Sequence, residues 1–349
     1  MVERLGCSLV STVLNDLAGA RDLLADLVVQ TRHPDEFVVV DGGSEDGTYA
    51  YLQEQAERLP FELRVLQECG CNVSRGRNLA IEVAVSGIIL TTDFGCRLDP
   101  GWVEALLRPF EQDPAVEIVT GSWKIPAEEI RTPAQWAEWA LSGGEIEMVA
   151  TPTCLASTRS LAYRKQVWRE FGRYPEDLTL AGDDAIFSLW MVAAGKMIAA
   201  APDAWCIWHR FEHLSGFLRE ARRNLRGAGE ALFFLHFGIR AGMLFAVEMA
   251  SALALCTSII GLAFGVSARW ALASALLFLL AWAKRFTKWA RAIGRLRSAG
   301  QGANWAMIPR FELAVRCYGI LGFWEGFFYG RKHCRSCRER MVALKVPRW

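Results

Sequence analysis

The sequence predicts an α/β fold, in which a mainly parallel β-sheet with helices on both faces precedes a transmembrane helical hairpin and an interfacial helix. Two observations predict it. Over the first 120 residues, short apolar segments alternate with segments of helical periodicity. The charge is also divided, because residues 210–349 hold 22 Lys and Arg against 7 Asp and Glu, a net +15, whereas the preceding residues carry −14. This division favours an acidic globular half followed by a basic half attached to a membrane.

The apolar segments predict strands, and the periodic segments between them predict helices. The expected strands are residues 7–14, 37–40, 63–67, 87–92 and 116–120. The expected helices are residues 18–30, 45–58, 75–85 and 102–110. Ligands of such sheets bind beyond the carboxyl ends of the strands. We therefore expect the chemistry where residues 15–16, 41–44 and 93–95 follow three of these strands.

The second half contains two uncharged stretches. Residues 249–265 would span about 25 Å as a helix, and residues 270–283 are again uncharged. Six positive charges without an acid follow between residues 284 and 297. A buried hairpin of a soluble protein is the alternative, but the basic flank favours a membrane hairpin with both ends in the cytoplasm. We expect a multi-pass protein of the cell inner (cytoplasmic) membrane whose globular domain faces the cytoplasm.

These segments set the expected boundaries. They are a ligand-binding and catalytic domain over residues 1–210, basic connecting helices over 211–240, the transmembrane hairpin over 241–283 and a basic, aromatic, membrane-associated region over 284–349. Residues 305–329 mix aromatic and charged side chains, so they lie in the membrane interface or form a third membrane-dipping helix. The basic residues 331–348 are expected to rest against anionic headgroups.

Composition and cysteine usage narrow the class of protein. Charged residues are only 22% and hydrophobic residues 52%, which disfavours disorder and a nucleic-acid-coating polypeptide, so no nucleic acid partner is expected. No signal peptide is recognised, and the ten scattered cysteines fit a reduced cytosol. The run His333-Cys334-x-x-Cys337 could hold part of a zinc site, but no second pair of ligands accompanies it. We interpret these thiols as residues near a basic membrane surface.

Four motifs occur in order at suitable spacing. They are Thr12-Val13-Leu14-Asn15-Asp16, Val38-Val39-Val40-Asp41-Gly42-Gly43-Ser44-Glu45-Asp46-Gly47-Thr48, Asn72-Val73-Ser74-Arg75-Gly76-Arg77-Asn78 and Leu90-Thr91-Thr92-Asp93. Each is common alone, but four in register are not expected by chance. The series resembles the family 2 glycosyltransferases, which are inverting enzymes with the GT-A fold that use nucleotide sugars. The resemblance covers roughly residues 7–210.

The resemblance implies which residues bind the nucleoside of a nucleotide-sugar donor. Asp41, followed by the turn of Gly43 and Ser44, is expected to hold the nucleoside. The segment containing Thr12 and Asn15 is expected to border the base pocket. The glycines permit the tight turn and a close approach of the ligand.

The resemblance also assigns residues to the diphosphate, the sugar and a metal. Arg75 and Asn78 begin the third helix and are expected to face the diphosphate or the sugar. Asp93 corresponds to the first carboxylate of an Asp-x-Asp motif, which lies near Mg²⁺ or Mn²⁺ bridging the diphosphate. Gly95 replaces the second carboxylate, so metal binding depends more on Asp93, on phosphate oxygens and on a later residue. His209 is the candidate for that residue, and a strand-end histidine without a ligand role is an equal alternative.

A second acidic site follows Gly182 at the start of an apolar helix. Asp183 and Asp184 could cap that helix. An inverting transfer, however, needs a base on the face of the sugar opposite the leaving diphosphate. The resemblance makes Asp184 the base and Asp183 its acceptor-binding or electrostatic neighbour. A basic run then provides either a solvated or membrane-facing helix or a clamp for phosphates of the leaving nucleotide or of a lipid acceptor; its members are Arg210, Arg219, Arg222, Arg223 and Arg226.

Together these assignments predict a membrane-anchored glycosyltransferase. It would move a sugar from a nucleotide-sugar donor to a hydroxyl of a lipid-linked or cell-envelope glycan acceptor, in contact with membrane lipids. The first alternative is a non-catalytic membrane-bound nucleotide-sugar sensor or assembly partner, which only Gly95 supports. A nucleotidyltransferase is disfavoured because residues 15–18 after the first strand lack its Gly-rich, lysine-containing loop.

Overall fold

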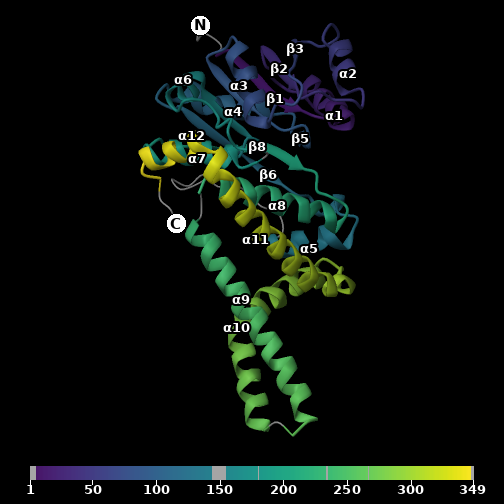
Figure 1. Cartoon of the computed structure of the whole chain (residues 1–349). Coiled ribbons are helices and arrows are strands. Elements are labelled where there is room, and N and C mark those ends of the chain that lie inside the picture. The colour runs from purple at the N-terminus through teal and green to yellow at the C-terminus, as the bar shows by residue number, and fades with distance from the viewer. Residues whose placement is uncertain (1–4, 144–154, 180, 233–234, 266, 347–349) are drawn as a thin grey trace.

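The computed structural model describes residues 5–143, 155–179, 181–232, 235–265 and 267–346. At its centre is an eight-stranded sheet with the strand order β3-β2-β1-β4-β7-β6-β8-β5 (Figure 1). The strands are β1 (Cys7–Val13), β2 (Glu36–Asp41), β3 (Glu62–Gln67), β4 (Ile88–Thr91), β5 (Cys96–Leu98), β6 (Ile118–Lys124), β7 (Leu161–Arg164) and β8 (Ala199–Trp208). The α-helices are α1 (Leu17–Val28), α2 (Thr48–Gln55), α3 (Val73–Val83), α4 (Trp102–Gln112), α5 (Pro133–Ser142), α6 (Lys165–Glu170), α7 (Asp183–Ala193), α8 (Leu214–Glu230), α9 (Leu235–Leu262), α10 (Ala268–Ser298), α11 (Met307–His333) and α12 (Arg335–Ala343).

The sheet is parallel in its first half and mixed in its second. β1 pairs parallel with β2 and with β4, and β2 pairs parallel with β3, as the sequence predicts. β7 lies antiparallel between β4 and β6, whereas β8 pairs parallel with β6 and antiparallel with β5. The sequence does not predict β5 and β7, because they have only three and four residues and show no measurable periodicity.

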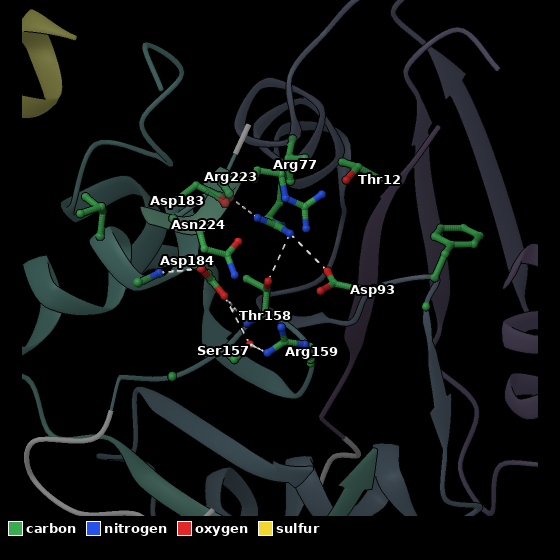
Figure 2. Close-up of a pocket in the computed structure, with 18 of the residues that line it drawn as sticks. Thr12, Arg77, Asp93, Ser157, Thr158, Arg159, Asp183, Asp184, Arg223 and Asn224 are labelled. Carbon is green, nitrogen blue, oxygen red and sulfur yellow. Dashed lines mark hydrogen bonds and ion pairs between the residues drawn. The ribbon is translucent and has the colours of Figure 1, made fainter. Parts of the chain in front are cut away.

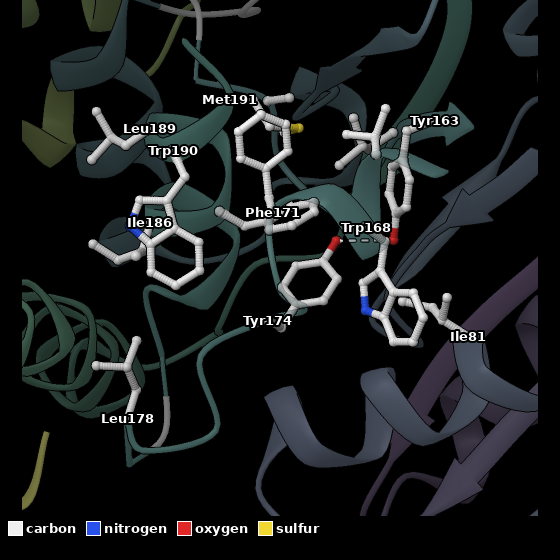
Figure 3. Close-up of a cluster of buried hydrophobic side chains, with 14 of the residues drawn as sticks. Ile81, Tyr163, Trp168, Phe171, Tyr174, Leu178, Ile186, Leu189, Trp190 and Met191 are labelled. Carbon is white, nitrogen blue, oxygen red and sulfur yellow. Dashed lines mark hydrogen bonds between the residues drawn. The ribbon is translucent and has the colours of Figure 1, made fainter. Parts of the chain in front are cut away.

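Helices cover both faces of the sheet, as predicted. All side chains from Phe37 to Val40 in β2 are buried. The odd-numbered ones pack with residues of α1 and α4, and the even-numbered ones pack with residues of α3, α6 and α7. Figure 3 shows the aromatic part of the cluster that contains the even-numbered residues. There the hydroxyls of Tyr163 and Tyr174 are 3.2 Å apart. Because alternate side chains of a strand point to opposite faces, this burial requires a cover on each side.

Two long apolar helices, α9 and α10, extend away from the sheet (Figure 1). Gly238–Leu262 has a mean hydropathy of 2.0 and Ala268–Ser298 has one of 1.2, and both are long enough to cross a membrane. Only 11% of the most apolar part of each helix is buried, so they are not core helices of a soluble protein. The hairpin predicted over residues 241–283 is present, and α9 begins inside the predicted connecting region. Two exposed apolar helices suggest membrane association.

The helix α11, which contains most of residues 305–329, packs on the globular domain through α8. A Cβ atom on Gly322 would lie 2.1 Å from the carbonyl oxygen of Arg222 in α8, and one on Gly326 would lie 2.0 Å from that of Arg226. Glycine therefore lets the two backbones touch. Phe323, between these glycines, is buried in the core cluster beneath α7.

The helix α12 also packs against the globular domain. Cys334, Cys337 and Met341 are buried in the same core cluster. The Cys334 thiol donates a hydrogen bond to the carbonyl oxygen of Asp177 at 2.8 Å, and burial raises its pKa to about 12. Among the described residues no group of three or more His, Cys, Asp or Glu side chains is arranged to hold a metal. The His-Cys-x-x-Cys run is therefore a packing element.

Candidate active site

A cavity of about 690 Å³ lies at the carboxyl ends of β1 and β4, between these strands and the helices α7 and α8. The sequence predicts the chemistry at this edge of the sheet. The polar side chains lining the cavity are Thr12, Asp16, Arg77, Asp93, Ser157, Thr158, Arg159, Asp183, Asp184, Arg223 and Asn224 (Figure 2). Four predicted site residues, from three separate segments, meet here: Thr12, Asp93, Asp183 and Asp184.

Arg77 connects the two acidic sites of the cavity. Its buried guanidinium forms an ion pair with Asp183 and lies 3.4 Å from Oδ1 of Asp93. It also donates a hydrogen bond to the hydroxyl of Thr158 at 3.2 Å and lies over the ring of Tyr174. Figure 2 shows this guanidinium between the two carboxylates. Arg77 belongs to the third sequence motif, which by itself predicts no role for it.

Asp183 is the buried member of the acidic pair. Burial raises its pKa from 3.8 to about 6, although the charge of Arg77 opposes this rise and Asp184 and Asp93 add to it. The same burial makes the ion pair structurally important, because a buried carboxylate without its cation is costly. Asp183 is therefore held in place by Arg77 and is poised to titrate near neutral pH.

Asp184 is half-buried and faces the cavity. Its Oδ2 accepts hydrogen bonds from the hydroxyl of Ser157 at 3.3 Å and from the backbone N–H of Thr158 at 3.4 Å. The helix α7 begins at Gly182, whose φ of 90° requires glycine, and no side-chain oxygen caps the helix there. Oδ1 of Asp184 accepts a hydrogen bond from the first-turn backbone N–H of Ala185 at 2.8 Å, so this oxygen serves the helix end while Oδ2 contacts Ser157 and Thr158. Asp184 is the more accessible of the two carboxylates.

Asp41 ends β2 and forms a separate anchor beside the cavity lining. Its Oδ1 accepts hydrogen bonds from the backbone N–H groups of Gly43 at 2.9 Å and Ser44 at 2.8 Å, and from the side chain of Gln67 at 3.0 Å. Its buried Oδ2 has no hydrogen-bond partner. Burial acts to raise the pKa of Asp41, but these hydrogen bonds outweigh it and hold the pKa below its usual value. Among the described residues, Oδ2 of Asp41 is therefore a buried acceptor with free hydrogen-bonding capacity.

The loops after β1 and β2 are fastened to each other next to this anchor. The backbone N–H of Asn15 donates to the hydroxyl of Ser44 at 2.8 Å, and the side chain of Asn15 accepts from the backbone of Glu45 at 2.8 Å. Asn15 has a φ of 53° and Gly43 a φ of 101°. The residues predicted to bind the nucleoside thus lie close together. The chain neighbours of Asn15 line the 690 Å³ cavity.

Arg75 and Asn78, which were expected to face the diphosphate or sugar, do not line the cavity. Arg75 pairs with Glu68 at 2.8 Å on the surface. Asn78 is fully buried, and its amide is saturated by hydrogen bonds to Trp168, to the backbone of Tyr174 and to Glu176. An amide whose donors and acceptor are all engaged has nothing left for a ligand. Asn78 instead fixes the segment that follows α6.

In the Asp93-Phe94-Gly95 segment after β4, the residue available as a carboxylate ligand for a divalent ion is Asp93. The side chain of Asp93 is 43% exposed there, and the space where a side chain of Gly95 would begin is open. The backbone N–H of His209 donates to the carbonyl of Gly95 at 3.3 Å, but its imidazole lies 3.4 Å from Glu129 and outside the cavity lining. These residues fit an ion held largely by a ligand's phosphate oxygens, not a closed protein site.

The basic run after β8 divides among several roles. Arg210 is buried between Glu138 and Glu220 and stacks on the ring of Trp208 at 3.6 Å. Arg222 and Arg226 form ion pairs with Glu325 and Glu230. In this run Arg223 lines the cavity.

A further cation, Arg159, lines the cavity from the segment before β7. It stacks on the ring of Trp208 at 3.7 Å and donates a hydrogen bond to Ser157 at 3.0 Å. The sequence analysis missed Arg159, because it belongs to none of the four motifs. The available signal in the sequence was Trp208 at the end of β8, the aromatic residue on which Arg159 stacks.

Carboxylates at the ends of β2 and β4, with an acidic pair at the start of α7 beside the same cavity, define an α/β domain whose site lies at the carboxyl edge of the sheet. Residues 8–167 match the family model "Glycosyl transferase family 2". These residues, a little under half of the chain, therefore form a family 2 glycosyltransferase domain. The family and the GT-A fold predicted from the sequence are confirmed.

Two similar proteins agree with this assignment. The chain is 26% identical over 185 residues to the O-antigen chain rhamnosyltransferase RfbN of Salmonella typhimurium. The alignment covers 50% of this chain and 57% of that protein. The chain thus spans little more than half the length of this curated relative. The structure of the mannosyltransferase PcManGT from Pyrobaculum calidifontis, in complex with GDP-Man and Mn²⁺, shares the fold with a TM-score of 0.54 and 17% identity. The alignment covers 94% of this chain and 88% of that one.

Proposed function

We propose that this protein transfers a sugar, with inversion, from a nucleotide-sugar donor to a hydroxyl of a lipid-linked or cell-envelope glycan acceptor. The observation that carries the proposal is the placement of Asp93 and Asp184 in one cavity, with Arg77 and Asp183 between them. A carboxylate on each side of one cavity is what an inverting displacement requires. The similarity to an O-antigen chain rhamnosyltransferase supports an envelope glycan as the acceptor class.

The two strand ends support a position for the donor. The unpartnered Oδ2 of Asp41 accepts a hydrogen bond from the nucleoside, and the diphosphate extends toward Asp93. Asp93 would hold Mg²⁺ or Mn²⁺, and the ion would supply positive charge that stabilises the leaving diphosphate. Arg223 and Arg159 add cations to the same cavity.

The transfer follows from the side of Asp184. Asp184 takes the proton of the acceptor hydroxyl while that oxygen forms a bond to the anomeric carbon. The bond from the anomeric carbon to the diphosphate breaks, and its electron pair leaves with the nucleoside diphosphate. Asp183, fixed by Arg77, holds the first turn of α7 so that Asp184 points into the cavity. Hydrogen bonds from Ser157 and Thr158 orient the carboxylate of Asp184.

We place this reaction at the cytoplasmic face of the inner membrane. The exposed apolar hairpin supports membrane attachment, and the basic stretch from Lys284 to Arg297 supports a cytoplasmic location for the ends of the hairpin. The enzyme would then meet soluble donors and membrane-held acceptors on the same side.

Release of nucleoside diphosphate by the full-length protein in detergent, with membrane lipids supplied, tests the proposal. Common nucleotide sugars are screened with Mg²⁺, Mn²⁺ or a chelator. We expect release from one donor class and loss of release in the chelator. Donor binding without release would instead support the sensor alternative, which the single carboxylate at the metal position favours. No binding of any donor would contradict both.

A further inference from the structure

A second cavity, of about 610 Å³, lies where the hairpin meets the globular domain. The helices α8, α9, α10 and α11 all contribute to its wall. Its apolar lining includes Leu225, Leu244, Val315 and Ile320. The sugar transfer proposed for the first cavity uses none of its charged residues, so they require a separate explanation.

The cavity has more cationic than anionic side chains. Arg285 pairs with Glu248 at 3.0 Å and with Glu312 at 2.6 Å, and Lys288 pairs with Glu312 at 3.0 Å. Arg316 forms an ion pair with Glu248 and completes this network. The fourth cation of the lining, Arg240, forms no ion pair with the residues that the structure describes, so an excess positive charge faces the cavity.

The position of the cavity along the hairpin matches the edge of a lipid bilayer. Arg240 lies about 33 Å, and Arg285 about 26 Å, along their helices from the turn between α9 and α10. The hydrocarbon core of a bilayer is about 30 Å thick. A hairpin that crosses the bilayer therefore places these cations at the depth of the lipid phosphates, with Leu244 on the side toward the acyl chains.

The second cavity adjoins the active site. Leu225 of α8 lines both cavities, and its neighbours Arg223 and Asn224 line the first one only. We propose that the second cavity binds the phosphate head of the lipid that carries the acceptor, with the lipid chain along its apolar wall. This inference rests on the proposed function, and it makes the acceptor a phosphate-bearing lipid. A free anion would leave the apolar wall unused, and a neutral lipid would leave Arg240 without a partner.

Binding of a long-chain polyprenyl phosphate by the full-length protein in phosphatidylcholine nanodiscs tests the proposal, with native mass spectrometry or a fluorescent analogue as the readout. We expect Arg240→Glu to weaken this binding at least tenfold. Arg219→Glu makes the same charge change at an exposed position of α8 outside both cavities and should bind as the wild type does. Leu244→Arg, which places charge in the apolar wall, is a second variant that should also weaken binding. Thermal melting of each variant checks that it folds.

Three outcomes separate the two proposals. If Arg240→Glu binds polyprenyl phosphate as tightly as the wild type, the second cavity is not the lipid site. If phosphatidylglycerol competes as well as polyprenyl phosphate does, the cavity is a general anionic-lipid site and the carrier assignment is wrong. If Arg240 is needed for binding but no donor is turned over, the lipid site stands and the proposed transfer fails. Release of nucleoside diphosphate should be the same in the control Arg219→Glu and the wild type, because Arg219 lines neither cavity.

Discussion

The two buried aspartates of the active-site region have opposite electrostatic behaviour. Asp41 and Asp183 are both shielded from solvent, yet the pKa of Asp41 lies below its usual value and that of Asp183 is raised to about 6. Asp41 receives hydrogen bonds from two backbone N–H groups and from Gln67. Asp183 has the cation Arg77 instead, with Asp184 and Asp93 as nearby like charges.

This comparison shows that the hydrogen-bond donors around a carboxylate affect its pKa more than its burial does. Backbone N–H groups of a tight turn are fixed dipoles that bring no second ion to desolvate, so they stabilise the charge of Asp41. The pair of Asp183 and Arg77 must bury two charges, and each depends on the other. Asp41 is therefore a constant anchor, whereas Asp183 responds to its partner and to pH.

The largest expected effect concerns Asp184, the accessible neighbour of Asp183. Asp184→Asn keeps the shape and the hydrogen bonds from Ser157 and Thr158 but cannot accept a proton. We expect kcat to fall on the order of 10²–10⁴-fold while donor affinity remains. Measurements of nucleoside diphosphate release and of donor binding by calorimetry check this. Asp203→Asn, at an exposed carboxylate paired only with Arg108, is the matched control. Equal loss of donor binding in Asp184→Asn would contradict the assignment of Asp184 as base.

The second-largest expected effect is on the free energy of unfolding, through the buried ion pair of Arg77 and Asp183. Arg77→Met leaves Asp183 buried without a cation, and we expect the free energy of unfolding to fall by about 3–5 kcal/mol. In the double variant Arg77→Met with Asp183→Asn, no charge is left unpaired, so its loss should be smaller than the sum of the single losses. Chemical denaturation of the four proteins measures this coupling. Additive losses would show that Arg77 and Asp183 do not depend on each other.

The inward orientation of Arg77 could have been predicted from the sequence but was not. Ser74, Arg77, Asn78 and Ile81 are buried together on one face of α3, at the spacing i, i+3, i+4 and i+7. Helical periodicity alone therefore indicates that Arg77 faces inward and Arg75 outward. The family resemblance drew attention to Arg75 and Asn78 instead, because it identifies a segment and not the side of the helix.

Other parts of the site were predictable for a clear physical reason. Asp41, Asp93 and Asp183 each lie at the end of an apolar strand or the start of an apolar helix, next to glycine or a turn, so local sequence places them at the ligand-binding edge. Thr158 and Arg159 precede the short strand β7 and belong to no motif. The return of α11 onto α8 depends on contacts between residues about 100 positions apart, which local periodicity does not detect.

A smaller effect, on donor affinity, is expected from a substitution of Asp41. Asp41→Asn keeps the oxygen that accepts from Gly43 and Ser44 but replaces the unpartnered Oδ2 with an N–H₂ group that cannot accept from the nucleoside. We expect donor affinity to weaken by roughly 10- to 100-fold, the cost of about 1–3 kcal/mol for an unsatisfied buried group, with little change in kcat. Calorimetric titration of the donor and steady-state kinetics separate the two quantities. A loss of kcat at saturating donor would show that Asp41 acts on the transfer step and not on binding.

The smallest effect is a pH dependence with opposite signs for stability and activity. Because the pKa of Asp183 rises from 3.8 on folding to about 6, the folded protein binds this proton more tightly. Its contribution to stability is full below about pH 4 and is lost as the pH rises through 6. The wild type should therefore gain stability relative to Asp183→Asn between pH 6 and pH 4, as thermal melting at each pH would measure. Activity should fall over the same interval, because a protonated Asp183 no longer holds Arg77 in place. An acid limb of kcat that is unchanged in Asp183→Asn would assign that limb to another group.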